Sequence, residues 1–175
     1  MIETTSRQIE DIRTRIKSGK IHSDEKIWTF LTAHLIDQAG TKSELLQKFT
    51  KEDVAPDNDL NLWFESQPIP PRQGISGNTE GNTKLDLAFG DIRKRGDTKA
   101  GIEFGKKNNW VCFVEAKLYS DCSTSVSYDP FRNQITRVIE NLITFQSDHE
   151  YPDRTFFCLL TPRIFKQRPF SKLYG

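Results

Sequence analysis

Hydrophobic and polar residues alternate along residues 83–89, which is the pattern of a β-strand with one face against a hydrophobic core. The core face carries Leu85, Leu87 and Phe89. The opposite face carries Lys84, Asp86 and Ala88. Because successive side chains of a strand point to opposite faces, Asp86 is expected in mid-strand on the polar face.

Two apolar runs, residues 110–118 and 155–161, predict buried strands. The first run contains Glu115 and Lys117, which are two residues apart and therefore share one face. Burying a charge costs several kcal/mol unless the charge is paired or binds a metal. The pair therefore marks this strand as a candidate functional element.

Helical spacing of apolar residues begins early in the chain, weakly within the first 22 residues and more clearly after Ser23. Ser23 is predicted to cap a helix that ends near Gly40, with Glu25 in its first turn. A short second helix is expected over residues 43–49.

A further helix is predicted to begin at Asp129 and Pro130, since Asp is a favoured N-cap and Pro a favoured first helical residue. Its apolar stripe consists of Phe131, Ile135, Val138, Leu142 and Phe145. Residues 60–64 predict a short strand. The order of helix, short helix, strands, helix and strand predicts an α/β or α+β domain with one central sheet.

Composition narrows the class of protein. The chain has 175 residues, of which 35% are hydrophobic, and its 12 Phe and 3 Trp argue against disorder. A net charge of +1 excludes a global attraction to nucleic acid or membrane, so a basic surface must be local. No apolar run approaches the roughly 20 residues that span a bilayer, and the N-terminus lacks an apolar signal region, so we expect a cytoplasmic protein.

The polar residues of the two strongest strands form a chemical set. If these strands pair, as consecutive strands often do, then Asp86, Glu115 and Lys117 converge. Two carboxylates provide the hard oxygen ligands that Mg²⁺ or Mn²⁺ prefers, and such a metal can activate water. An ammonium group can orient that water and stabilise negative charge in a transition state. This is the set of groups needed to hydrolyse a phosphodiester.

The arrangement of Asp86 on one strand and Glu115-Ala116-Lys117 on the next resembles the PD-(D/E)xK nuclease superfamily. The resemblance implies a restriction endonuclease-like fold, with a central mixed sheet flanked by helices in the order α-β-β-β-α-β. The resemblance covers residues from about 23 to 161 of a single domain. Residues 1–22 are expected to be a polar, helical extension. Residues 162–175 are expected to be a tail, and the abrupt end of the sequence pattern suggests that this tail is truncated.

Site residues follow from the resemblance residue by residue. Asp86 and Glu115 are expected to bind the metal and Lys117 to be the catalytic lysine. Glu25 matches an acid that the family often carries on its first helix and is expected to be a further metal ligand, although the helix dipole alone would also favour an acid there. Gln134 matches a polar residue on the helix after the lysine, although it could equally be a solvated helix position. Two departures are Leu85, where the family motif has Pro, and the long gap between Asp86 and Glu115.

Basic residues of the connection before the second strand predict contacts with phosphates, although an exposed surface loop would have the same composition. The candidates are Arg93, Lys94, Arg95, Lys106 and Lys107, together with Arg137 on the last helix.

The functional hypothesis is a Mg²⁺-dependent or Mn²⁺-dependent endonuclease that acts on DNA. The alternative is a nuclease-like domain that binds nucleic acid or a protein partner without cutting. A homodimer would suit double-strand cleavage and is an expectation from the family.

Overall fold

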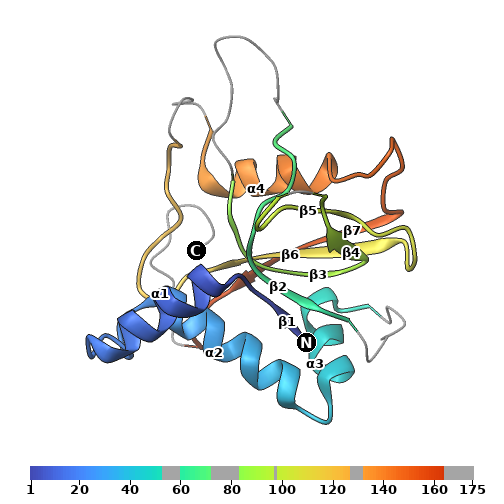
Figure 1. Cartoon of the computed structure of the whole chain (residues 1–175). Helices are drawn as coiled ribbons and strands as arrows, with labels where there is room; N and C mark the ends of the chain where they lie inside the picture. The colour runs from blue at the N-terminus through green and yellow to red at the C-terminus, as the bar shows by residue number, and fades with distance from the viewer. Residues whose placement is uncertain (53–59, 72–82, 97, 127–131, 164–175) are drawn as a thin grey trace.

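The structure is a computed structural model, and it describes residues 1–52, 60–71, 83–96, 98–126 and 132–163 (Figure 1). Within these ranges the chain forms four helices and seven strands, of mixed α/β class. The helices are α1 (Ser6–Lys17), α2 (Glu25–Gln38), α3 (Lys42–Thr50) and α4 (Gln134–Ile143). The strands are β1 (Ile2–Glu3), β2 (Leu62–Ser66), β3 (Leu85–Gly90), β4 (Ile92–Lys94), β5 (Ile102–Phe104), β6 (Trp110–Ala116) and β7 (Arg154–Leu160).

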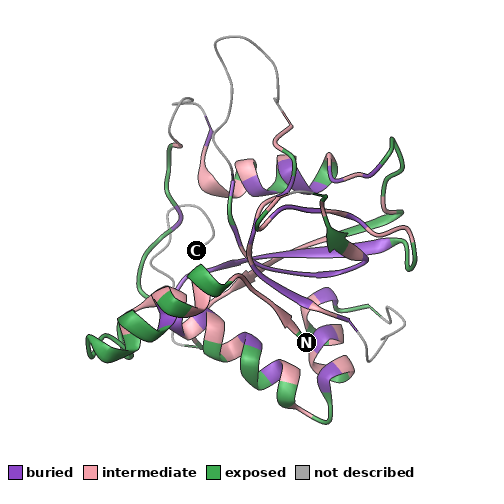
Figure 2. Ribbon diagram, viewed as in Figure 1, coloured by how far each residue is buried: buried purple, intermediate pink, exposed green. Residues whose placement is uncertain are grey.

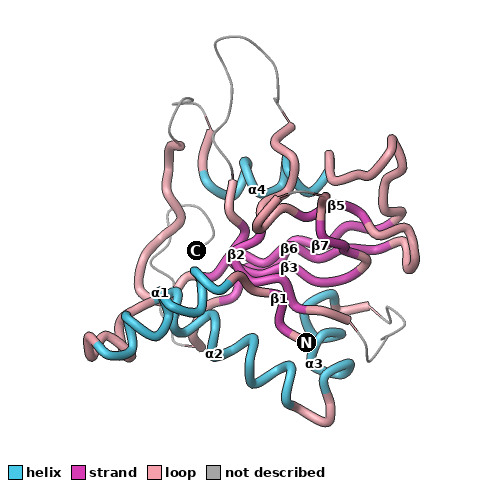
Figure 3. Tube along the Cα trace, viewed as in Figure 1, coloured by secondary structure: helices cyan, strands magenta, loops and turns pink. Residues whose placement is uncertain are grey.

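Five strands form one mixed sheet in the order β1-β2-β3-β6-β7 (Figure 3). The outer pairs β1–β2 and β6–β7 are parallel, and the inner pairs β2–β3 and β3–β6 are antiparallel. Strands β4 and β5 form a separate antiparallel hairpin. The predicted class, a central sheet flanked by helices, is therefore confirmed.

Helices and the hairpin cover both faces of the sheet, which makes its central strands the most buried part of the chain (Figure 2). One core cluster packs Ala33 and Ile36 of α2 and Leu46 of α3 against the sheet. The other cluster packs α4 and the hairpin strand β5 against the opposite face. The prediction that β3 has a single core face is wrong, because Ala88 on the predicted polar face is also fully buried.

Helix boundaries differ from the sequence prediction in two places. Asp24, not Ser23, caps α2, because its side chain accepts hydrogen bonds from the N–H groups of Lys26 and Ile27. Helix α4 begins at Gln134 and is capped by Asn133, whose side chain accepts from the N–H of Thr136. The predicted start at Asp129 and Pro130 lies outside the described residues, but residues 132–133 are not helical.

The first residues contribute to the sheet, which the sequence pattern does not predict. Ile2 and Glu3 pair in parallel with Leu62 and Trp63 of β2. Helix α1 follows, capped by Thr5 in a reciprocal capping box with Gln8. The Gln8 side chain also donates to the backbone carbonyls of Phe64 and Glu65. The start of the chain is thereby tied to the edge of the sheet.

Candidate active site

The predicted strands β3 and β6 are direct neighbours, which brings Asp86 beside Glu115. Their pairing runs from Gly90 and Val111 to Leu87 and Val114, so Asp86 and Glu115 are the next residues in line. One oxygen of the Asp86 carboxylate accepts a hydrogen bond from the Ala116 N–H at 2.8 Å. The carboxylate therefore binds the backbone of β6 where the strand pairing ends.

Lys117 lies at the centre of the group. Its ammonium is 2.9 Å from the Glu115 carboxylate and 3.2 Å from the carboxylate of Glu25. Glu115 is only 1% exposed and Lys117 only 5% exposed, so the ion pair is buried. The Lys117 backbone N–H donates to the Leu160 carbonyl of β7, which fixes the end of β6.

Glu25 reaches the site from the first residue of α2. Besides the ion pair with Lys117, its carboxylate accepts from the Leu118 N–H at 2.9 Å and from the Ser120 hydroxyl at 3.1 Å. The sequence does not identify Ser120 as a site residue, because this serine lies in a loop whose residues follow no periodic pattern. The structure thus brings the acid of the first helix to the strand that carries Lys117.

Gln134 reaches the site from the first residue of α4. Its side-chain N–H group donates to Glu115, and its side-chain oxygen accepts from the Ser123 N–H at 3.1 Å. The Gln134 backbone N–H also donates to the Ser123 carbonyl. These bonds to Ser123 hold the amide so that its donor faces the buried carboxylate.

The site contains more acids than bases. Three carboxylates, those of Glu25, Asp86 and Glu115, surround the single ammonium of Lys117. Burial and the nearby charge of Asp86 raise the pKa of Glu115 to about 7. Burial also raises the pKa of Asp86, against the opposing effects of the Ala116 N–H and of Lys117. A site that makes two carboxylates resist ionisation favours an additional cation.

The charge state of Lys117 follows from the same contacts. Burial alone would lower its pKa, but the adjacent Glu115, Glu25 and Asp86 charges hold the pKa above its usual value. Lys117 is therefore an ammonium at neutral pH, which can donate hydrogen bonds but cannot accept a proton.

The number of ligands sets the kind of metal that would fit. In the described part of the chain, no three His, Cys, Asp or Glu side chains gather in a way that could hold a metal ion by themselves. Asp86 and Glu115 offer two hard carboxylates, and Mg²⁺ is typically bound through one or two carboxylates with water and substrate phosphates. The two acids thus suit a metal that shares its ligands with a substrate.

The basic residues predicted to contact phosphates lie in different surroundings. Arg93 and Lys106 make ion pairs with acids, Arg93 with Glu103 and both with Asp148. Lys94 and Lys107 are exposed, and Arg95 is half-buried. Arg137 lies one turn after Gln134 on α4, and its buried Nε has no hydrogen-bond partner in the described part of the chain.

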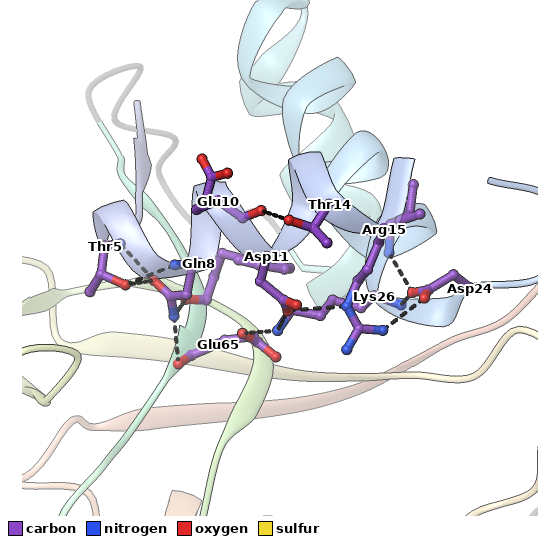
Figure 4. A network of polar contacts seen from close by, with 11 residues as sticks. Thr5, Gln8, Glu10, Asp11, Thr14, Arg15, Asp24, Lys26 and Glu65 are labelled. Atoms are coloured by element: carbon purple, nitrogen blue, oxygen red, sulfur yellow. Dashed lines mark hydrogen bonds and ion pairs between the residues drawn. The ribbon is translucent and has the colours of Figure 1, made fainter. Parts of the chain in front are cut away.

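A second polar cluster lies beside the site, between α1, α2 and β2 (Figure 4). Lys26, next to Glu25, is 2.6 Å from both Asp11 and Glu65. Arg15 is 3.1 Å from Asp11 and 2.7 Å from Asp24. Glu65 has a positive φ of 45° within β2, between residues paired with β3, a conformation rare for a residue with a side chain. The sequence gives no signal for this conformation.

Comparisons with protein families, with curated proteins and with solved structures found no match for this chain. Among the helices that the structure describes, none combines the length and the apolar composition that a membrane span requires.

Proposed function

We propose that this chain is a metal-dependent nuclease that hydrolyses phosphodiester bonds in DNA. One observation carries the proposal: Asp86, Glu115 and Lys117 converge from neighbouring strands at a point where Glu25 and Gln134 also arrive from two helices. The resemblance to the PD-(D/E)xK superfamily supports the same reading and extends it to a restriction endonuclease-like core. It also favours DNA as the substrate.

Asp86 and Glu115 would hold Mg²⁺ or Mn²⁺. The excess of buried negative charge and the raised pKa of both groups support this assignment, because a bound cation would relieve their repulsion. When bound, such a metal lowers the pKa of a water ligand and neutralises charge on the scissile phosphate.

The remaining residues have separable roles. The Lys117 ammonium orients the attacking water and stabilises negative charge that develops on the phosphate. Glu25 positions Lys117 through its ion pair and joins it to the Leu118 backbone. Gln134 holds the Glu115 carboxylate in place from α4.

The alternative is a catalytically silent domain that binds nucleic acid or a protein partner. Burial of intact acidic and basic groups at considerable desolvation cost argues against it, since a silent site would be free to replace them with apolar residues. Calorimetric titration with Mn²⁺ separates the two readings. Absence of Mn²⁺ binding at millimolar concentration would favour the silent domain.

The direct test of activity is incubation of the purified chain with supercoiled, linear and single-stranded DNA, in Mg²⁺, in Mn²⁺ and in EDTA. We expect metal-dependent cleavage of at least one substrate, lost in Asp86→Asn. The control is Asp153→Asn, which removes an exposed acid outside the site. Cleavage that persists in EDTA, or at the wild-type rate in Asp86→Asn, would refute the proposal.

A further inference from the structure

A small pocket of about 70 Å³ opens at the β1–β2 edge of the sheet, away from the candidate active site residues. Three segments line it: the start of α1 with Thr5, strand β2 with Trp63 and Ser66, and the β4–β5 hairpin with Lys94 and Lys99. Ligand pockets for drug-sized molecules typically have about 300 Å³ or more, so this pocket suits a small group.

Two buried donors on β2 lack an acceptor in the part of the chain that the structure describes. They are the indole N–H of Trp63 and the hydroxyl of Ser66. Trp63 is 8% exposed and Ser66 2% exposed, and both line the pocket. An indole N–H can only donate, so its missing partner must be an acceptor. Buried donors usually have partners, which points to an acceptor-rich ligand.

Positive charge gathers at the same pocket. Lys94 and Lys99 are exposed and make no ion pair within the described residues, in contrast to Arg93 and Lys106 on the same connection. The N-terminus of α1, capped by Thr5, adds the positive end of a helix dipole.

The acid that lines the pocket is Glu3, and its carboxylate accepts a hydrogen bond from Asn61. Two lysines against one glutamate leave a net charge of +1 among the lining residues.

We propose that this pocket binds a phosphate group. The oxygens of a tetrahedral phosphate point in several directions, so one group would bind the hairpin lysines and, once the Ser66 or Trp63 side chain turns toward it, would accept from β2 as well. Ser66 pairs with Leu85, the residue before Asp86, so the strand that lines the pocket is the neighbour of the strand that carries Asp86. The inference stands on the pocket, and only the nucleic-acid source of the phosphate rests on the proposed nuclease function.

The first test is calorimetric titration with inorganic phosphate in EDTA, with sodium chloride at matched ionic strength as reference. We expect Lys94→Ala combined with Lys99→Ala to weaken binding at least about tenfold, because hydrogen bonds to charged groups are the strong ones. The matched control, Lys20→Ala combined with Lys48→Ala, removes the same charge from two exposed positions outside the pocket and should bind as the wild type does.

Ser66→Ala gives a second, independent variant. It removes a hydroxyl that has no partner in the described structure, so the fold should keep its stability while phosphate binding weakens. The inference is overturned if the wild type shows no phosphate-specific binding up to about 10 mM. Equal binding by the pocket and control variants would overturn it as well.

The source of the phosphate is decided with short single-stranded DNA, with and without a 5′-phosphate, again in EDTA. A preference for the phosphorylated strand that the Lys94 and Lys99 substitutions remove identifies a nucleic-acid phosphate. Binding of inorganic phosphate without that preference identifies a free phosphate. A chain that binds phosphate but never cuts DNA would refute the proposed function and leave this inference intact.

Discussion

Two charged clusters lie side by side in this molecule and shift the pKa values of their acidic side chains in opposite directions. In the cluster between α1, α2 and β2, Asp11 and Asp24 have lowered pKa values (Figure 4). In the candidate active site, Asp86 and Glu115 have raised pKa values. Glu25 of the site and Lys26 of the cluster are neighbours in the sequence. The opposite pKa shifts therefore arise although the two groups of charges lie next to each other.

The number of cations close to each acid explains the difference between the pKa shifts. Each acid of the first cluster has a cation within 3.1 Å, Arg15 or Lys26. In the site, one ammonium serves three carboxylates, and Asp86 accepts only a backbone N–H among the described contacts. Paired charges of the first kind hold helices to a sheet, whereas an excess of buried acid favours a cation from solution.

Lys117→Met should have the largest effect, since it removes the only cation that the described residues bring to the site. Breaking a buried ion pair costs about 3–5 kcal/mol, so we expect a loss of stability of that order in urea unfolding at neutral pH. Mn²⁺ should restore part of it, because a cation replaces the lost charge. Cleavage should fall at least about 10³-fold.

The control is Lys48→Met, an exposed lysine of α3 outside both clusters, which should leave cleavage and unfolding nearly unchanged. Wild-type cleavage by a folded Lys117→Met protein would remove Lys117 from the mechanism.

Glu115→Gln should stabilise the protein, which sets the site apart from ordinary ion pairs. The pKa of Glu115 rises from 4.5 to about 7 on folding, so the wild type loses stability as the pH rises through that window. The raised pKa already includes the attraction of Lys117 and corresponds to about 3 kcal/mol, of which the glutamine should recover the greater part because it carries no charge to desolvate. We expect a gain of about 2 kcal/mol at pH 8 that disappears near pH 4.

Thermal and urea unfolding of both proteins across this pH range measures the gain. Because the glutamine keeps an oxygen for the Gln134 N–H to bond, the packing is preserved. A glutamine variant that is less stable than the wild type at pH 8 would show that the buried acids are not in excess. Mn²⁺ binding should weaken in the same variant.

The sequence predicts the site better than the cluster, for a physical reason. Charges inside an apolar strand pattern are conspicuous, so Glu115 and Lys117 were identified, and alternation placed Asp86 on the neighbouring strand. The ion pairs of the first cluster join residues such as Lys26 and Glu65 that are far apart in the chain and lie on polar faces. Surface charges carry no pattern that selects partners.

Several features of the backbone also cannot be predicted from the sequence. Strand β1 has two residues, too few to show a period, and its pairing depends on β2. Asn133 caps α4 although Asp129 is an equally good cap by residue type, so the choice depends on tertiary contacts. The positive φ of Glu65 cannot be predicted either, because glutamate has no preference for this conformation.

Lys26→Met should destabilise the fold without affecting the site's chemistry. The Lys26 side chain is 20% exposed and its ammonium bridges Asp11 and Glu65, so its removal should cost about 1–2 kcal/mol in urea unfolding. Mn²⁺ affinity should stay within about threefold, because Lys26 contacts neither Asp86 nor Glu115 in the described structure. The control is Lys20→Met, an exposed lysine. A large change in Mn²⁺ affinity would show that the two clusters act as one unit.

Asp24→Asn should have the smallest effect and the opposite sign to Glu115→Gln. Burial alone would raise the pKa of Asp24, but the hydrogen bond from Arg15 and the N–H groups of α2 lower it below 3.8. An acid with a lowered pKa stabilises the fold at pH values above its pKa in the unfolded chain. This stabilisation is lost as the pH falls through its pKa in the folded chain. Asparagine caps helices as well as aspartate does, so the substitution keeps the cap but removes the charge and the oxygen that accepts from Arg15.

We therefore expect Asp24→Asn to lose about 1 kcal/mol near pH 7 and to match the wild type at about pH 2. Asp153→Asn, an exposed acid, should stay within about 0.5 kcal/mol of the wild type throughout. Neutralising an acid then destabilises the protein in one cluster and stabilises it in the other. If both substitutions changed stability in the same direction at neutral pH, the contrast between paired and excess acids would fail, and with it the electrostatic argument for a metal at Asp86 and Glu115.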